Sequence, residues 1–378
     1  MIKNVAYLAP VYEPAIGGGV VYLRLLSKGL IDRSFCERFT IVTEAYPDCD
    51  ADESRLDGRL RIIRKYPFRA GRSERNNFRF VVYLIQNLQF FLLPLFARSN
   101  AVDVLFVHGS LLNNPTTLWI VERLIRLISP RTRLIADLRD PKMPISKIAK
   151  LRRFDMIISC SRNITNLFDI DAEASKLVRE IPIIVEVEKI PAEQIDAAME
   201  RYGLARRDYV FNGSGLVVGK GVERLLEVVH AARKTHPELK LVVAGKKRQW
   251  TPEMEAAQAE GWFIYLGQMP QADVHALSAG AYIDANLSSV DSMPRHSLEA
   301  LAAGARVLLP AGVPEFDTLC PGWVSSDASE EAEASKLLEL GGEDAPVCSY
   351  PIEAHNLELV VEQYMEEMLV MFNEPPTR

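Results

Sequence analysis

Apolar runs of strand length alternate with helix-length segments along the first half of the chain, and this alternation restricts the fold more than any other feature. The runs span residues 5–9, 39–43, 104–107, 134–137, 156–160 and 181–185. Strands separated by helical segments form parallel sheets, because each crossover helix lets the next strand start in the same direction. The first half is therefore predicted to be a doubly wound α/β domain.

The pattern restarts in the second half, after a polar helical stretch at residues 192–202. Its strand-like runs span residues 209–213, 239–244, 263–266, 282–285 and 306–309. A chain of 378 residues is long enough for two domains. We expect two Rossmann-like domains, residues 1–190 and 191–353, facing a central cleft, and a helix within residues 354–378 that packs back on the first domain. Ligands of such sheets bind at the carboxyl ends of the strands.

Composition places the chain among globular proteins. It contains 48% hydrophobic and 25% charged residues, as soluble proteins do. The N-terminus lacks the apolar stretch and small-residue cleavage site of a signal peptide, so we expect a cytoplasmic protein. We expect no nucleic-acid partner. The cysteines form no C-x-x-C pair and are predicted to be reduced thiols: Cys36, Cys49, Cys160, Cys320 and Cys348.

The stretch D-S-M-P-R-H-S-L-E-A-L-A-A-G carries the strongest functional signal. Asp291 and Glu299 stand eight positions apart, while Pro294 marks a helix start and Gly304 suits its end. Backbone N–H groups at a helix start suit a diphosphate, and carboxylates accept hydrogen bonds from sugar hydroxyls. A pair of acids on a solvated helix is the alternative. The pairing predicts a site for a nucleotide sugar, which would act as a sugar donor. The residues predicted to bind this donor are Asp291, Ser292, Met293 and Glu299.

Two glycine-containing loops each follow the first strand of a domain. In N-G-S-G-L-V-V-G-K-G-V, Lys220 can neutralise a leaving diphosphate without a metal, and Ser214 is a further donor-binding candidate. A solvated lysine is the alternative. In P-V-Y-E-P-A-I-G-G-G-V, glycines open a helix and let backbone approach a phosphate or acceptor, unless they only form a tight turn. The predicted donor-binding glycines are Gly17, Gly18 and Gly19.

Polar residues also follow other strands of the first domain. In L-I-A-D-L-R-D-P-K, Arg139 can donate to sugar or phosphate oxygens, and Asp140 can orient it or an acceptor hydroxyl. A surface ion pair is the alternative, and Asp137 suits a structural role. His108 ends another strand and is either an acceptor-binding residue or a packed or capping residue.

Metal-binding and hydrolase motifs find no support. D-C-D at residues 48–50 and D-I-D at residues 169–171 do not follow suitable strands and are predicted to be surface acids. We expect no essential metal and no cofactor. The sequence lacks a G-x-S-x-G elbow, an H-E-x-x-H helix and a G-x-x-x-x-G-K-[ST] loop.

A basic stretch precedes an uncharged one in the first domain. Residues 55–79 hold nine basic and two acidic residues, although the chain has a net charge of -6. Residues 80–97 carry no charge, but three amides and a proline argue against a lipid-buried helix. Peripheral contact with the anionic inner membrane surface is one interpretation. A solvated loop followed by a core helix is the other.

Together these motifs resemble those of retaining glycosyltransferase family 4, which has the GT-B fold. The acidic stretch is similar to the family's E-x7-E element, in the subgroup whose first acid is Asp. The resemblance implies that Glu299 holds ribose and that Asp291 faces the donor hexose. The residues that we expect to act in catalysis are Arg139, Asp140, Lys220 and Asp291.

Two positions depart from the family pattern. The Gly-rich loop is similar to the family's Pro-x-x-Gly-Gly loop, but the Glu often found three residues after its first Gly is Val20 here. The family usually places Arg five residues before the lysine of the second loop, where this chain has Gly215. The positive charge of that Arg must then come from elsewhere, or the donor is held more weakly.

The predicted function is transfer of a sugar from a nucleoside diphosphate sugar to a hydroxyl acceptor, with retention of configuration. The expected acceptor is a polysaccharide or a lipid-linked intermediate. One alternative is a sugar-nucleotide epimerase of the same fold, which converts the donor without an acceptor. Another is a noncatalytic nucleotide-sugar-binding protein, which the departures at Val20 and Gly215 favour.

Overall fold

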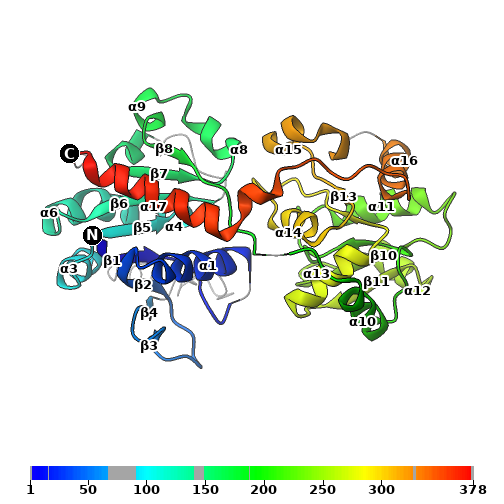
Figure 1. Ribbon diagram of the computed structural model, residues 1–378, viewed down its shortest axis with the longest axis horizontal. Helices are drawn as coiled ribbons and strands as arrows, with labels where there is room; N and C mark the ends of the chain where they lie inside the picture. Colours follow the sequence, from blue (N-terminus) through cyan, green and yellow to red (C-terminus); the bar gives the residue numbers. More distant parts are fainter. Residues whose placement is uncertain are drawn as a thin grey trace. The chain divides into compact units, whose positions relative to one another are not determined.

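The computed structural model describes residues 2–15, 17–66, 91–139, 149–186, 188–326 and 329–375. The chain forms two compact units, Met1–Ile184 with His355–Arg378, and Val185–Ala354 (Figure 1). Among the described helices, none has the length and apolar character needed to cross a bilayer. Three sequence predictions fall outside the described ranges: Asp140, residues 67–79 of the basic stretch and residues 80–90 of the uncharged stretch.

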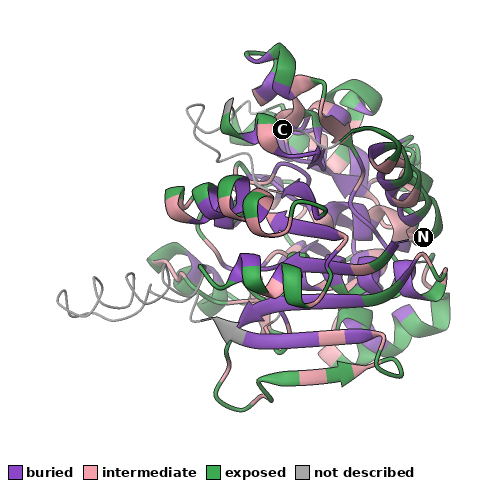
Figure 2. Ribbon diagram, turned by 90° about the vertical axis from the view of Figure 1, so that its left-hand side faces the viewer, coloured by how far each residue is buried: buried purple, intermediate pink, exposed green. Residues whose placement is uncertain are grey.

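The first unit is built on an eight-stranded sheet with the order β3-β4-β2-β1-β5-β6-β7-β8 in its described residues. Neighbouring strands pair in parallel, except that β3 and β4 form an antiparallel hairpin at one edge. Figure 2 shows the strands as largely buried, with β3 exposed at the edge. The strands are β1 (Ile2–Leu8), β2 (Cys36–Glu44), β3 (Asp52–Arg55), β4 (Leu60–Tyr66), β5 (Val104–His108), β6 (Arg133–Leu138), β7 (Met156–Ser159) and β8 (Val178–Glu180).

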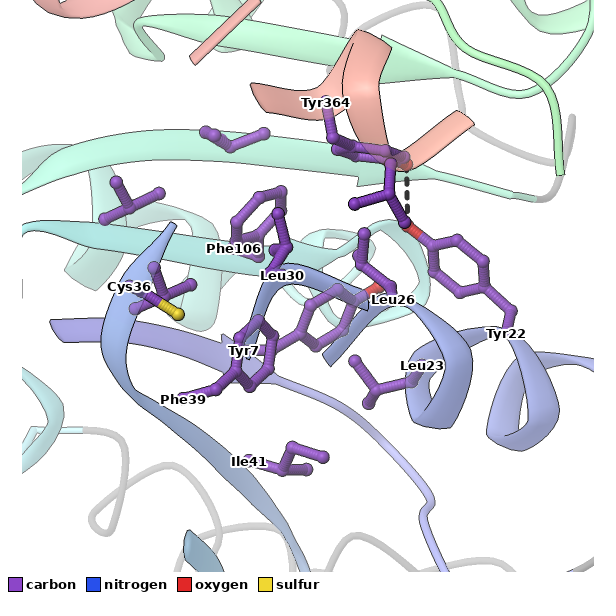
Figure 3. Packing of buried hydrophobic residues seen from close by; sticks show 14 of the residues in the cluster. Tyr7, Tyr22, Leu23, Leu26, Leu30, Cys36, Phe39, Ile41, Phe106 and Tyr364 are labelled. Atoms are coloured by element: carbon purple, nitrogen blue, oxygen red, sulfur yellow. Dashed lines mark hydrogen bonds between the residues drawn. The ribbon is translucent and has the colours of Figure 1, made fainter. Parts of the chain in front are cut away.

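Two long helices cover the core of the first unit. α1 (Gly18–Asp32) buries Leu23, Leu26 and Leu30, whose spacing of three and four residues places them on one face (Figure 3). α17 (Leu357–Asn373) packs directly on α1. The shorter helices are α3 (Leu93–Ser99), α4 (Gly109–Leu112), α5 (Pro115–Trp119), the π-helix η1 (Ile120–Ile125), α6 (Arg126–Ile128), α8 (Arg162–Thr165), α9 (Ala172–Ser175) and the 3-10 helices η2 (Ala149–Arg153) and η3 (Asn166–Phe168). The 3-10 helix η5 (Ile352–His355) contains the point in the sequence where the chain passes from the second unit back to the first.

The contact between α1 and α17 is close because of a glycine. A Cβ at Gly29 would lie 2.6 Å from Val361 Cγ2. Val361 is fully buried, as are Val360 and Met368 on the same helix. α17, the last described helix of the chain, therefore packs in the same core as the N-terminal strands.

The second unit contains a parallel sheet with the order β11-β10-β9-β12-β13 in its described residues. One face buries apolar residues of α11 and α16, and the other buries those of α10 and α13. Its strands are β9 (Tyr209–Asn212), β10 (Lys240–Ala244), β11 (Phe263–Gly267), β12 (Ile283–Ala285) and β13 (Val307–Leu308). Its helices are α10 (Ala192–Tyr202), α11 (Val222–Ala232), α12 (Pro252–Ala259), α13 (Gln271–Gly280), α14 (Arg295–Ala303), α15 (Pro314–Leu319), η4 (Pro321–Trp323) and α16 (Glu330–Gly341).

The prediction of two α/β units with parallel sheets is confirmed, with two corrections to the strands. The strand predicted at residues 181–185 is wrong, because the ladder with β7 runs over Val178–Glu180. Ile181 and Ile184 are buried in the core without belonging to a strand. The prediction also lacked the β3 and β4 hairpin, whose turn uses left-handed backbone at Leu56, Asp57 and Gly58.

Candidate functional site

The loops after β9 and β12 lie together in the second unit, because these strands are parallel neighbours and end at the same edge of the sheet. Lys220, in the first loop, donates to both carboxylate oxygens of Asp291, in the second, at 2.6 and 2.8 Å. Ser288 Oγ donates to Asp291 Oδ2 at 2.7 Å. The Lys220 and Asp291 side chains are 28% and 22% exposed, so the pair remains reachable from solvent.

Two glycines allow these loops to approach so closely. Gly219 and Gly221 have φ of 84° and 74°, values that residues other than glycine rarely adopt. A Cβ at Gly221 would lie 2.1 Å from the carbonyl oxygen of Leu287. A pocket of about 510 Å³ adjoins the loops, and its lining residues are Gly219, Gly221, Glu223, Arg224, Leu287, Ser288, Ser289, Ala311 and Ser325.

Glu299 lies on α14 and is buried, with 4% of its surface exposed. Arg295 Nε donates to Oε1 at 2.7 Å, and Gln271 Nε2 donates to Oε2 at 2.8 Å. His275 Nε2 lies 3.6 Å from Oε2. Burial acts to raise the pKa of Glu299, but the neighbouring His275 and the charge of Arg295 outweigh it and lower that pKa. The carboxylate is therefore ionised at neutral pH.

The start of α14 agrees with the prediction that Pro294 marks a helix start. The helix begins at Arg295, directly after an extended Pro294. Ser292 and Met293 are both buried in the loop that leads to the helix. The predicted end is confirmed, since Gly304 has a left-handed φ of 87°.

His296 connects the carboxyl ends of β9 and β12. Its Nε2 lies 3.0 Å from the Gly213 nitrogen and 3.0 Å from Asp284 Oδ2. The neutral Nε2 accepts from Gly213, whereas the protonated one donates to Asp284. Burial lowers the pKa of His296, but Asp284 outweighs it and raises the pKa, which favours the protonated ring. The charges of Glu299 and Lys220 both act on this imidazole, so the two predicted donor-binding groups share one neighbourhood.

The backbone at residues 212–216 leaves no room for a side chain at position 215. Ser214 N–H donates to Asn212 Oδ1 at 2.9 Å, which forms a tight turn. Gly215 has a φ of 81°, and a Cβ there would lie 2.7 Å from the backbone N and O of Lys246. A long side chain at position 215 would require the loop after β10 to move.

The predicted residues of the first unit lie on three elements. Gly17 precedes α1, and Gly18 and Gly19 are within its first turn. A Cβ at Gly17 or Gly19 would meet no atom within 4 Å, so space surrounds this turn. His108 ends β5 and its Nδ1 accepts from Ser110 N–H at 3.2 Å, which caps the short helix α4.

Arg139 lies after β6 and is mostly buried, with 12% of its side chain exposed. Its Nε donates to Asp137 Oδ1 at 2.7 Å, and its Nη2 donates to Tyr364 Oη on α17. The guanidinium also lies 3.8 Å from the centre of the Tyr22 ring. The alternative of an exposed ion pair is therefore wrong for Arg139.

The sequence prediction did not include the partners of Glu299. Arg295 precedes Glu299 by four residues on one helix, a spacing that predicts an ion pair and was available from the sequence. Gln271 and His275 come from α13, and only the fold places them beside α14. In the described part of the chain, no group of three His, Cys, Asp or Glu side chains is arranged for a metal ion. In the D-I-D stretch, Asp171 caps α9 and binds Arg152.

Comparison with protein families gives a match in the second unit. Residues 198–316 match the family model described as Glycosyl transferases group 1. This stretch contains Lys220, Asp291 and Glu299. No curated protein matches the sequence closely enough to count as a relative. The matching residues all lie within the second unit.

Solved structures with low sequence identity share the fold of the whole chain. A sucrose-phosphate synthase from Thermosynechococcus elongatus is 14% identical with a TM-score of 0.71, over 98% of this chain and 99% of the other. A glycosyltransferase from Rickettsia africae is 13% identical with a TM-score of 0.71, over 99% and 100%. HepE from Anabaena, in complex with UDP and glucose, is 15% identical with a TM-score of 0.65, over 98% of each chain. The architecture is that of the GT-B glycosyltransferases.

Proposed function

We propose that this protein transfers a hexose from a nucleoside diphosphate sugar to a hydroxyl acceptor, with retention of configuration and without a metal. The observation that carries the proposal is the ion pair of Lys220 and Asp291, because the charge of Lys220 acts on the same imidazole, His296, as that of the ionised, buried Glu299. All three lie within the residues that match Glycosyl transferases group 1.

Lys220 is the proposed partner of the donor diphosphate. In the free protein one carboxylate, Asp291, balances its charge at 2.6 and 2.8 Å. A diphosphate has more negative charge and more acceptor oxygens than a carboxylate, so it displaces Asp291. Asp291 then faces the hexose. The ammonium and the N–H groups at the start of α14 stabilise the charge that develops on the leaving phosphate.

Glu299 is the proposed partner of the ribose. Each carboxylate oxygen has two lone pairs, and Arg295 and Gln271 each occupy one. His275 also lies 3.6 Å from Oε2, so Oε1 is the oxygen proposed to accept from a ribose hydroxyl. Because Arg295 and Gln271 also fix the carboxylate, little side-chain entropy is lost when the ribose binds.

The remaining predicted residues have proposed roles around this donor. Gly17, Gly18 and Gly19 are assigned to donor binding, as are Ser214, Ser292 and Met293. In the retaining reaction, the departing phosphate oxygen takes the proton of the incoming hydroxyl. Arg139, Asp140 and His108 are assigned to the reacting sugar and the acceptor.

UDP-glucose is the first donor to test. HepE, which has the same fold, has been solved with UDP-glucose and with UDP and glucose. For the acceptor, we propose a polysaccharide or lipid-linked hydroxyl, used at the inner membrane surface. An apolar surface of α3 and its neighbours supports this, with Phe91, Leu92, Leu95 and Trp119 between 42% and 58% exposed. Flotation with anionic and neutral vesicles tests it, and failure to bind anionic vesicles at low salt contradicts it.

The experiment that tests the function is a thermal-shift panel of nucleotide sugars, followed by turnover of those that bind. UDP-glucose or a related donor should stabilise the wild type, and Lys220→Ala and Glu299→Ala should each reduce turnover at least tenfold. Lys234→Ala is the matched control, because Lys234 forms an exposed ion pair with Glu331 elsewhere in the second unit. Equal turnover by all variants would contradict the site assignment. Binding without any transfer would instead indicate a noncatalytic protein.

The comparisons do not favour the epimerase alternative. The matched family model is one of glycosyl transferases, and the similar structures include a synthase and a glycosyltransferase. An epimerase would interconvert the sugar of the donor without an acceptor. Product analysis of UDP-glucose incubated alone separates the two, because a transferase yields UDP and free sugar slowly.

A further inference from the structure

A buried polar network in the first unit joins Arg139 to two helices. Tyr7 Oη donates to Asp137 Oδ2, and Asp137 accepts from Arg139 Nε. Arg139 Nη2 donates to Tyr364 Oη, which lies 2.6 Å from Tyr22 Oη (Figure 3). Asp137 has no exposed side-chain surface, and the three tyrosines are at most 4% exposed.

The network connects parts of the chain that are far apart in sequence. Tyr22 lies in α1, four residues after Gly18, and Tyr364 lies in α17. Arg139 follows β6, and its guanidinium stacks on the Tyr22 ring at 3.8 Å. The helix that begins at the glycine turn is therefore connected to Arg139 both by this stacking and through the hydroxyl of Tyr364.

The chemistry of the network favours one fixed arrangement. A buried guanidinium is unfavourable unless it is paired and hydrogen-bonded, and Asp137 supplies the opposite charge. Burial raises the pKa of Tyr22 and of Tyr364, so both hydroxyls stay protonated at neutral pH. Arg139 cannot rotate without losing these partners. The side chain is 12% exposed, and its Nη1 atom is buried as well.

We propose that Tyr364 and Tyr22 are positioning residues, which hold the Arg139 guanidinium and the start of α1 in the geometry that sugar transfer requires. This rests on the proposed function, because Arg139 is there assigned to the reacting sugar. α17, which contains no predicted site residue, thereby contributes to sugar transfer through Tyr364. The tyrosines act through Arg139 and do not contact the substrate.

Tyr364→Phe and Tyr22→Phe test this, because each keeps the buried ring and removes one hydroxyl. The readouts are UDP binding and the kcat and KM for release of UDP from UDP-glucose. Each variant should lower kcat about tenfold and leave the KM for UDP-glucose and the Kd for UDP within twofold. The double variant should lose little more than either single one, because both changes remove the same hydroxyl pair.

Tyr209→Phe is the matched control. Tyr209 is also fully buried, and its hydroxyl donates to the Leu277 carbonyl at 2.7 Å at the opposite end of β9 from the Lys220 loop. It should lower Tm by a similar few degrees without changing kcat. If Tyr364→Phe keeps the wild-type kcat, or loses no more than Tyr209→Phe, the positioning proposal is wrong. If the wild type neither binds UDP nor releases it from any nucleotide sugar, the proposed function fails and this inference fails with it.

Discussion

The ion pair between Lys220 and Asp291 leads to a prediction with opposite effects on binding and turnover. Asp291→Asn removes the negative charge that balances Lys220 in the free protein, but keeps the shape of the side chain. UDP then no longer has to displace a carboxylate from the ammonium. UDP should therefore bind the variant more tightly than it binds the wild type, even though one predicted site residue has been changed.

The structure sets the size of this effect. Exposed ion pairs contribute about 0.2–1 kcal/mol. This pair is bidentate and its side chains are only 28% and 22% exposed, which places it near the upper end of that range. If UDP no longer has to break an ion pair worth about 1 kcal/mol, it should bind roughly fivefold more tightly. Turnover of UDP-glucose should fall in the same variant, because the proposed contact of Asp291 with the hexose is lost.

Calorimetric titration with UDP at low and high salt measures the binding, and UDP release measures the turnover. Asp196→Asn is the control, because Asp196 forms an exposed ion pair with Arg206 in the same unit. Lys220→Met should weaken UDP binding about 10-fold to 100-fold, the value of a hydrogen bond to a charged group. Weaker binding of UDP by Asp291→Asn would refute the displacement of Asp291, and would show that this carboxylate holds Lys220 in place for the ligand.

Three further predictions concern stability, each measured by urea unfolding. Gly221→Ala should lower the free energy of unfolding by about 2–5 kcal/mol, because of its left-handed backbone and its overlap with a carbonyl. Gly261 is also left-handed but lies in open space, so Gly261→Ala should lower it by only about 1–2 kcal/mol. Equal losses in the two variants would contradict the packing argument. Gly29→Ala should cost about 1–3 kcal/mol, and Val361→Ala in the same chain should recover part of it by making room. Because the folded-state pKa of Glu299 is lowered, its ionisation stabilises the protein above the ordinary carboxyl pKa of about 4.3. That stability should be lost as the pH falls through the folded-state pKa of Glu299. If the free energy of unfolding of a Glu299→Gln variant depended on acidic pH in the same way as that of the wild type, this would be contradicted.

The sequence predicts the layout of both sheets well, because strands that are buried on both faces are nearly continuous apolar runs. The runs at residues 104–107 and 134–137 lie within β5 and β6. The run at residues 181–185 shows the limit of this signal. Apolar residues predict burial there, but only pairing with β7 decides which residues join the ladder.

The site is predictable where it is local in sequence and not where it depends on tertiary contacts. The loop containing Lys220 and the acidic stretch follow from turn residues and helix signals within a few positions of each other. The pairing of Lys220 with Asp291 depends on β9 and β12 being neighbours. Likewise, Arg139 is identified by its place after a strand, but its burial depends on Tyr364 from the far end of the chain.

The packing of α17 against α1 has a consequence for biosynthesis. Val360, Val361 and Tyr364 complete a core whose first strands are made some 350 residues earlier. Domains usually fold on the ribosome in the order of their synthesis. Here the later, continuous unit is translated in full before α17 exists, so it can mature first. The earlier unit must wait as an incomplete intermediate with exposed apolar surface, and a premature stop before α17 would leave it permanently in that state.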